Sequence, residues 1–300
     1  MEQETKALRL SVVMNLIMAA LGLGFGWISG SQAILLDGFF SLIGFAMALV
    51  TIRVARLVLQ PPDEHFHFGY AQFEPFLNTV KGLLMLGVAG FALAASIGAI
   101  VSGGREVRPG LGIVYALVAL AGCLVVGGLQ GRAARRLASP LLKVDSNHWL
   151  IDGLLSGVVA AVFVLALILG RTSFAYVVPY IDPVLVIVLI AAILAVPIRT
   201  IRHGLREVLA FAPEPEVQED VRGRVEGAIR DLPLTASHIR MMKVGRFLYV
   251  LNQLVVSPEF KVRSVADLDA IRARIAAAME GVEPTPVLDT VFTEDEKWTE

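Results

Sequence analysis

Long apolar runs separated by short polar stretches make up the first two thirds of the chain. A helix needs about 20 residues to cross a hydrocarbon core of roughly 30 Å, and six of the runs reach that length. Turn-forming Gly, Ser and Pro residues separate the runs. The pattern predicts an α-helical polytopic membrane protein with spans near 9–29, 33–57, 75–101, 111–131, 145–170 and 180–202.

From about residue 204 the apolar runs become shorter and change period. Helical spacing over Glu216–Ile229 and Val265–Met279 alternates with β-rich runs at His238–Val244, Phe247–Val256 and near 287–292. The predicted order is α-β-β-α-β, which suits a two-layer α+β domain. We therefore expect a transmembrane domain over residues 1–203 and a C-terminal domain over 204–300.

Composition supports the membrane assignment, because 56% of the residues are hydrophobic and the mean hydropathy is +0.69, above the range usual for soluble domains. The formal net charge is −1, and no Lys- and Arg-rich block suggests a nucleic-acid partner. The single cysteine, Cys123, excludes a disulfide framework and a Cys-rich zinc site within one chain.

Basic residues fall mainly on one side of the predicted spans, which orients the chain. The other side has only Arg105, Arg108 and Arg171. We expect both termini in the cytoplasm, and the short loops without a targeting signal favour a bacterial inner membrane. The residues on the predicted cytoplasmic side are Lys6, Arg9, Arg53, Arg56, Arg132, Arg135, Arg136, Lys143, Arg199, Arg202 and Arg206.

Three ionisable residues lie within the apolar runs: Asp37, His148 and Asp152. A charge at bilayer depth costs roughly 2.5 to 3.5 kcal/mol on insertion scales, so such residues usually face a bundle interior, a water-filled path or a cation. His148 and Asp152 share one helix face, with Asp145 one turn away. Nitrogen and oxygen ligands suit zinc, manganese, iron or cobalt. The alternative is a polar cluster that bonds to a neighbouring helix.

The pattern Asp145-x-x-His148-x-x-x-Asp152 resembles the fifth helix of the cation diffusion facilitator family. Further matching features are Gly30-Ser31, the Pro-Asp-Glu-His stretch at 62–65, Phe68-Gly69, Phe73-Glu74 and Asp182-Pro183. The resemblance implies a homodimeric exporter that exchanges a cytoplasmic divalent cation for protons. It also implies a tetrahedral site shared by the second and fifth helices, and a ferredoxin-like dimerisation domain at residues 204–300.

The second helix departs from this pattern, because the expected ligand positions hold Phe40 and Gly44. Asp37 is the only acid in this span, one turn nearer the outside, and Ser41 offers a weak oxygen ligand one turn below it. The predicted site is therefore Asp37, His148 and Asp152 with Ser41 or water as the fourth ligand. Alternatively, Asp37 caps or hydrogen-bonds the outer end of its helix.

Two other features leave alternatives open. Lys81, at the start of the third span, either extends to the interface or pairs with Asp37 or Glu74 as a proton-linked switch. In the loop after the second span, Asp63, His65 and His67 alternate as on an extended strand. The resemblance implies a second metal site in this loop, of which only the ligand Asp63 is matched. Alternatively, the loop is an ordinary surface loop with polar residues.

The leading hypothesis is a divalent cation and proton antiporter whose metal is substrate rather than cofactor. The sequence offers no nucleophile beside His148, so we expect no enzyme. Two alternatives remain: a transport-inactive partner or regulatory subunit, suggested by Phe40 and Gly44, and a proton-coupled carrier of a non-metal solute, suggested by Lys81. The sequence leaves open which metal is carried and whether the dimer contains one kind of chain or two.

Overall fold

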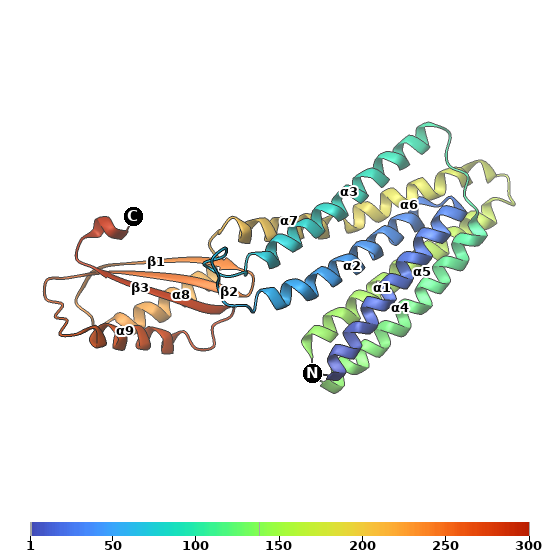
Figure 1. Ribbon diagram of the computed structural model, residues 1–300. Coiled ribbons are helices and arrows are strands. Elements are labelled where there is room, and N and C mark those ends of the chain that lie inside the picture. Colours follow the sequence, from blue (N-terminus) through green and yellow to red (C-terminus); the bar gives the residue numbers. More distant parts are fainter. Residues whose placement is uncertain (1, 138, 300) are drawn as a thin grey trace. The chain divides into compact units, whose positions relative to one another are not determined.

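The computed structural model describes residues 2–137 and 139–299. Within these residues, six helical stretches are long and apolar enough to cross a membrane, which confirms the predicted spans (Figure 1). The last of them consists of two helices, preceded by a short 3-10 turn at Ala175–Val177. The helices of this part are α1 (Glu2–Ser29), α2 (Gln32–Leu57), α3 (Phe73–Val101), α4 (Pro109–Leu137), α5 (Pro140–Leu169), α6 (Val178–Ile193) and α7 (Ala195–Val208).

The sixth span is interrupted, whereas the sequence pattern predicts one continuous helix over 180–202. α6 ends at Ile193 and α7 begins at Ala195. Pro197 explains the break, because proline has no backbone N–H to donate to the carbonyl of Ile193, four residues earlier.

The C-terminal part has the predicted order α-β-β-α-β. β1 and β2 pair antiparallel, β2 and β3 pair parallel, and the sheet order is β1-β2-β3. Both helices contribute to one apolar core with the sheet, in which Val221 and Ile275 pack with Leu248 and Leu254. β1 begins before the predicted position and has a register shift near its start. The elements are α8 (Pro215–Ile229), β1 (Leu234–Val244), β2 (Phe247–Val256), α9 (Val265–Ala278), β3 (Thr285–Thr293) and a 3-10 turn at Glu296–Thr299.

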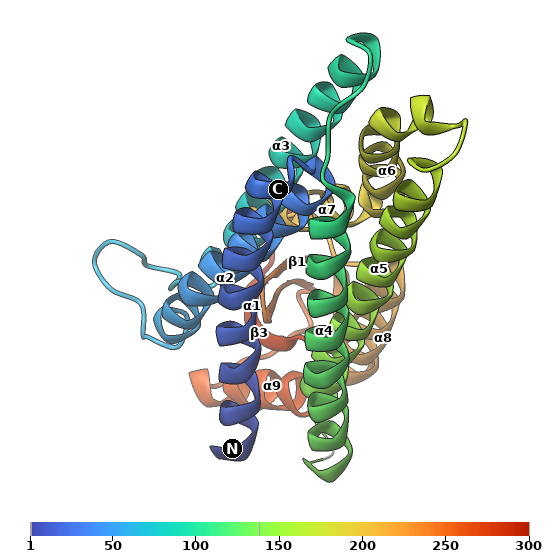
Figure 2. The same ribbon diagram turned by 90° about the vertical axis from the view of Figure 1, so that its right-hand side faces the viewer.

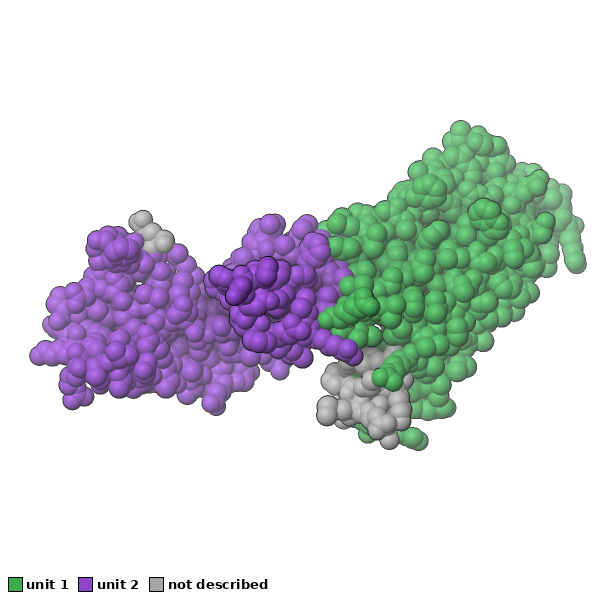
Figure 3. Space-filling model, in the orientation of Figure 1, with its two compact units in different colours: residues 1–53, 80–201 green, residues 54–79, 202–300 purple. Residues whose placement is uncertain are grey.

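The chain divides into two compact units (Figure 3). Unit 1 comprises residues 1–53 and 80–201, and unit 2 comprises residues 54–79 and 202–300. Unit 2 contains an apolar cluster in which Phe247 packs with Val58 and Tyr70, beside an ion pair between Glu74 and Arg246. The predicted functional division at 203/204 stays a prediction.

Glycines allow α4 and α5 to approach closely, and the two helices lie side by side in both ribbon views (Figures 1 and 2). A Cβ added at Gly112 would lie 2.8 Å from the ring of Phe163, and one at Gly127 would lie 3.1 Å from the Leu150 side chain. Small residues favour such contacts in membrane bundles, where association depends on van der Waals packing.

A second close approach joins α1 and α2. A Cβ added at Gly22 would lie 2.6 Å from the Cα of Gly38, a backbone contact that cannot relax by side-chain rotation. By contrast, a Cβ added at Gly24, one half-turn away, would meet no atom within 4 Å.

This pair of glycines gives a matched test of the packing. Gly22→Ala should lower stability by about 1–3 kcal/mol, because the added methyl overpacks the crossing. Gly24→Ala should preserve or raise stability, because alanine is the better helix former. Thermal unfolding of the purified protein in detergent measures both. Equal midpoints for the two variants would contradict the close crossing.

Candidate functional site

His148 and Asp152 form a pair on α5. They lie one turn apart, and His148 Nδ1 is 3.1 Å from Asp152 Oδ2. The side chains are 73% and 40% exposed, respectively. Both predicted ligands therefore lie on one helix face, as expected from their spacing, and remain accessible to a third group.

Asp37 on α2 receives a hydrogen bond from the hydroxyl of Tyr115 on α4. Asp37 itself is exposed, whereas Tyr115 is 3% exposed and its ring lies 6.0 Å from that of Phe25. Asp152 lies close enough to Asp37 to act on it electrostatically. The predicted α2 acid is thus held by a tyrosine that the sequence reading did not single out.

Phe40 and Gly44, the two α2 positions where metal ligands were expected, differ in their surroundings. Phe40 packs against the apolar core of the bundle. A Cβ at Gly44 would approach nothing closer than Asn15 Oδ1, at 3.9 Å, so this position has room for a larger side chain. Ser41 is half-buried.

Asp145 belongs to a separate polar cluster in the first turns of α5, one turn before His148. Ser11 on α1 donates a hydrogen bond to Asp145 Oδ2 at 2.5 Å, and it accepts one from Trp149 Nε1 at 2.9 Å and one from Gln130 on α4. Asp145 lies close enough to His148 to act on its charge, as does the half-buried Lys81. The cluster links α1, α4 and α5.

Across residues 2–137 and 139–299, no three His, Cys, Asp or Glu side chains gather closely enough to hold a metal ion. The structure brings His148 to Asp152, and it bonds Asp37 and Asp145 to other groups. Glu74 pairs with Arg246 rather than with Lys81. The proposed ligand set therefore stays a prediction.

Asp63 organises a turn in the loop after α2. Its Oδ1 accepts the backbone N–H groups of His65 and Phe66, each at 2.8 Å, and its Oδ2 accepts the hydroxyl of Tyr70. The Tyr70 and backbone hydrogen bonds lower the pKa of Asp63. These bonds therefore stabilise the loop above the ordinary pKa of an aspartate and are lost as the pH falls through the lowered one.

The expected strand-like alternation of Asp63, His65 and His67 is wrong. The N–H of Asp63 bonds to the carbonyl of Phe66 at 3.3 Å and closes a turn. The cause is local: an aspartate side chain bonds backbone groups two and three residues on, which favours a turn over a strand. Whether Asp63 binds a metal stays a prediction.

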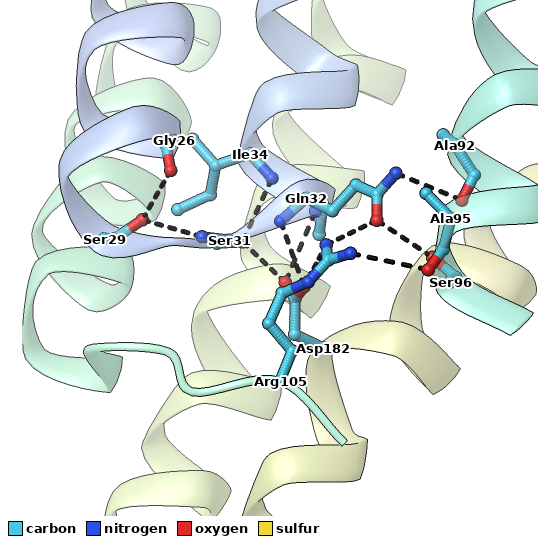
Figure 4. Close-up of polar contacts among 11 residues, drawn as sticks. Gly26, Ser29, Ser31, Gln32, Ile34, Ala92, Ala95, Ser96, Arg105 and Asp182 are labelled. Atoms are coloured by element: carbon cyan, nitrogen blue, oxygen red, sulfur yellow. Dashed lines mark hydrogen bonds and ion pairs between the residues drawn. The ribbon is translucent and has the colours of Figure 1, made fainter. Parts of the chain in front are cut away.

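A buried carboxylate on α6, Asp182, contacts the start of α2. The sequence singled it out only as part of the Asp182-Pro183 motif. Asp182 on α6 is 1% exposed and accepts hydrogen bonds from the Ser31 hydroxyl at 2.6 Å and from the backbone N–H groups of Gln32 and Ala33 at 3.0 and 3.3 Å (Figure 4). It therefore caps the N-terminus of α2 from another helix.

Arg105, in the connection between α3 and α4, completes this cap. Its guanidinium lies 3.8 Å from Asp182 Oδ2 and donates to the side-chain oxygen of Gln32 (Figure 4). The Gln32 amide in turn donates to the Ala92 carbonyl on α3 at 3.2 Å. The start of α2 is thus joined to α3 and α6 through one largely buried network.

The family of cation efflux transmembrane domains matches residues 8–209, more than half of the chain. The chain belongs to the cation efflux family, the cation diffusion facilitators. This membership confirms the resemblance carried by Asp145, His148 and Asp152.

Individual relatives within the cation efflux family match over shorter stretches. The cation-efflux pump FieF of Shigella boydii serotype 18 is 27% identical over 133 residues, which is 44% of each chain. FieF of Escherichia coli O1:K1 is 28% identical over the same length and share. The chain thus spans less than half the length of these relatives in the matched region.

The cap on α2 can be tested by an isosteric change. Asp182→Asn replaces one buried acceptor by a donor that faces the N–H groups of Gln32 and Ala33, which should lower stability by about 1–3 kcal/mol. Asp220→Asn is the matched control, because Asp220 forms an exposed ion pair with Arg224 and such pairs contribute roughly 0–1 kcal/mol. Thermal unfolding in detergent compares them, and an unchanged midpoint for Asp182→Asn would rule out the cap.

Proposed function

We propose that the protein exports a divalent metal cation from the cytoplasm in exchange for protons. The observation that carries this proposal is the accessible His148 and Asp152 pair on a membrane-spanning helix of a cation efflux protein. An imidazole and a carboxylate at bilayer depth are costly unless they serve a path or an ion.

The ligands that we assign to the transported ion are Asp37, His148 and Asp152, with Ser41 or water in the fourth position. Asp152 acts on Asp37 electrostatically, and two carboxylates near one another gain from a shared cation. Oxygen and nitrogen ligands suit zinc, manganese, iron(II) or cobalt. Asp145, one turn away, is proposed as an acid on the approach from the cytoplasm, and Asp63 as a second, loop-borne acid.

Proton exchange follows from the chemistry of these ligands. A metal binds deprotonated carboxylate and neutral imidazole, so protons and metal compete for the same atoms. Histidine titrates near neutral pH, which makes release by protonation feasible on the outer side. We place the chain in a bacterial inner membrane as a homodimer, with both termini in the cytoplasm.

One observation favours a second function. Phe40 packs into the bundle core and cannot ligate a cation, and Gly44 has no side chain. A chain that lacks both usual ligands could serve as a transport-inactive partner of an intact relative. Reconstitution of the chain alone distinguishes the two functions.

Metal-dependent proton flux into liposomes containing the purified full chain is the direct test. Asp152→Ala should reduce flux more than about tenfold, since even the loss of outer-shell partners of metal ligands costs 10- to 100-fold in affinity. Asp220→Ala, on the surface of α8, should leave flux unchanged. Flux at the wild-type rate in Asp152→Ala would refute the proposed metal site. Absence of flux from folded wild-type protein with zinc, manganese, iron(II) and cobalt would instead favour the partner-subunit function.

The open position at Gly44 gives a gain-of-affinity test. Gly44→Asp adds a carboxylate where the nearest atom to the new Cβ is 3.9 Å away, so the variant should fold. Metal affinity, measured by titration against a competing chelator, should increase because the site gains a charged ligand. Gly44→Asn is the uncharged control. Equal affinity in the two variants would show that the ion does not reach this level of α2.

A further inference from the structure

The acid of the proposed site and the two α5 ligands lie on different helices, so their separation depends on what joins α2 to α5. α4 is held against α5 by close contacts along its length. A Cβ at Gly153, next to Asp152, would lie 3.1 Å from the Cβ of Cys123 on α4, and Gly127 and Leu150 approach as closely. A group on α4 is therefore fixed relative to His148 and Asp152.

Tyr115 on α4 reaches α2. Its side chain is 3% exposed, its ring packs against Phe25, and its hydroxyl donates to Asp37 Oδ2. Gly22 makes room for this arrangement, because a Cβ there would lie 3.0 Å from the tyrosine hydroxyl. Tyr115 thus has a fixed position set by α1, α4 and the acid on α2.

We propose that Tyr115 is a positioning residue for metal binding, whose hydroxyl holds Asp37 in register with His148 and Asp152. This inference rests on the proposed function and extends it. The hydrogen bond occupies Oδ2 and leaves Oδ1 of the exposed Asp37 for a cation. A hydroxyl that bonds a carboxylate makes a strong, directional contact and reduces the rotamer freedom that metal binding would otherwise have to remove.

The same hydrogen bond explains how a chain with Phe40 and Gly44 can retain an α2 ligand. Asp37 lies three residues, about one turn, before Phe40. Tyr115 connects this acid to the α4 and α5 pair. Tyr115 therefore acts through Asp37 and is not itself a ligand.

Tyr115→Phe removes only the hydroxyl and keeps the ring on Phe25. The full-length protein in detergent is titrated with zinc, manganese, iron(II) and cobalt against a competing chelator, and the metal that wild type binds most tightly is used for all variants. Tyr115→Phe should lower the affinity for that metal about tenfold, the factor expected for the loss of one hydrogen bond to a charged group. Tyr176→Phe, which alters a 69% exposed tyrosine, should bind as wild type does.

A double-mutant cycle separates positioning from packing. In an Asp37→Asn background, Tyr115→Phe should cause no further loss of affinity. A tenfold loss that persists in this background, or no loss in the single variant while Asp37→Asn binds more weakly, would overturn the role of Tyr115 and leave the proposed function intact. Wild-type affinity in Asp37→Asn, or no binding of any of the four metals by wild type, would refute the assignment of Asp37 as a ligand. Both the role of Tyr115 and the ligand set of the proposed function would then be wrong.

Discussion

A carboxylate on a membrane-spanning helix needs a hydrogen-bond donor or an ion, because an uncompensated charge at bilayer depth is costly. In this protein the donors come from other helices. Tyr115 on α4 bonds Asp37 on α2, Ser11 on α1 bonds Asp145 on α5, and Ser31 at the start of α2 bonds Asp182 on α6. Each of these hydrogen bonds therefore fixes the register of two helices. The same bonds determine the positions of the three carboxylates along the bundle.

Close backbone approaches complement these polar links. Lipid tails are as apolar as leucine, so helices in a bilayer associate through packing rather than through a hydrophobic driving force. The glycines at the crossing of α1 and α2 and along α4 provide that packing. The crossing at Gly22 and Gly38 lies beside Asp37, so the approach of α1 to α2 and the position of the acid are parts of one arrangement.

The spans and the α-β-β-α-β order could be predicted because they depend on run length and periodicity, which are local. The break before Pro197 also has a local cause, and the proline alone could have indicated it. The partner of Asp182 could not be predicted, since Ser31 and Gln32 lie about 150 residues away in the chain. Asp37 was identified as a candidate by its depth in an apolar run, but nothing near it in the sequence indicates Tyr115. His148 and Asp152 were found together because a helix places residues four apart on one face.

The position of Asp37 has a consequence for the ion that the protein would carry. An acid three residues before the usual position stands about 4.5 Å further along the helix axis, at 1.5 Å per residue. A cation shared by Asp37, His148 and Asp152 then has three protein ligands, and water or Ser41 completes its shell. Zinc favours a closed set of four nitrogen, sulfur or oxygen ligands, whereas harder ions such as manganese accept more oxygen and more water. On the proposal that Asp37 supplies the α2 ligand, this ligand set would favour the harder metals over zinc.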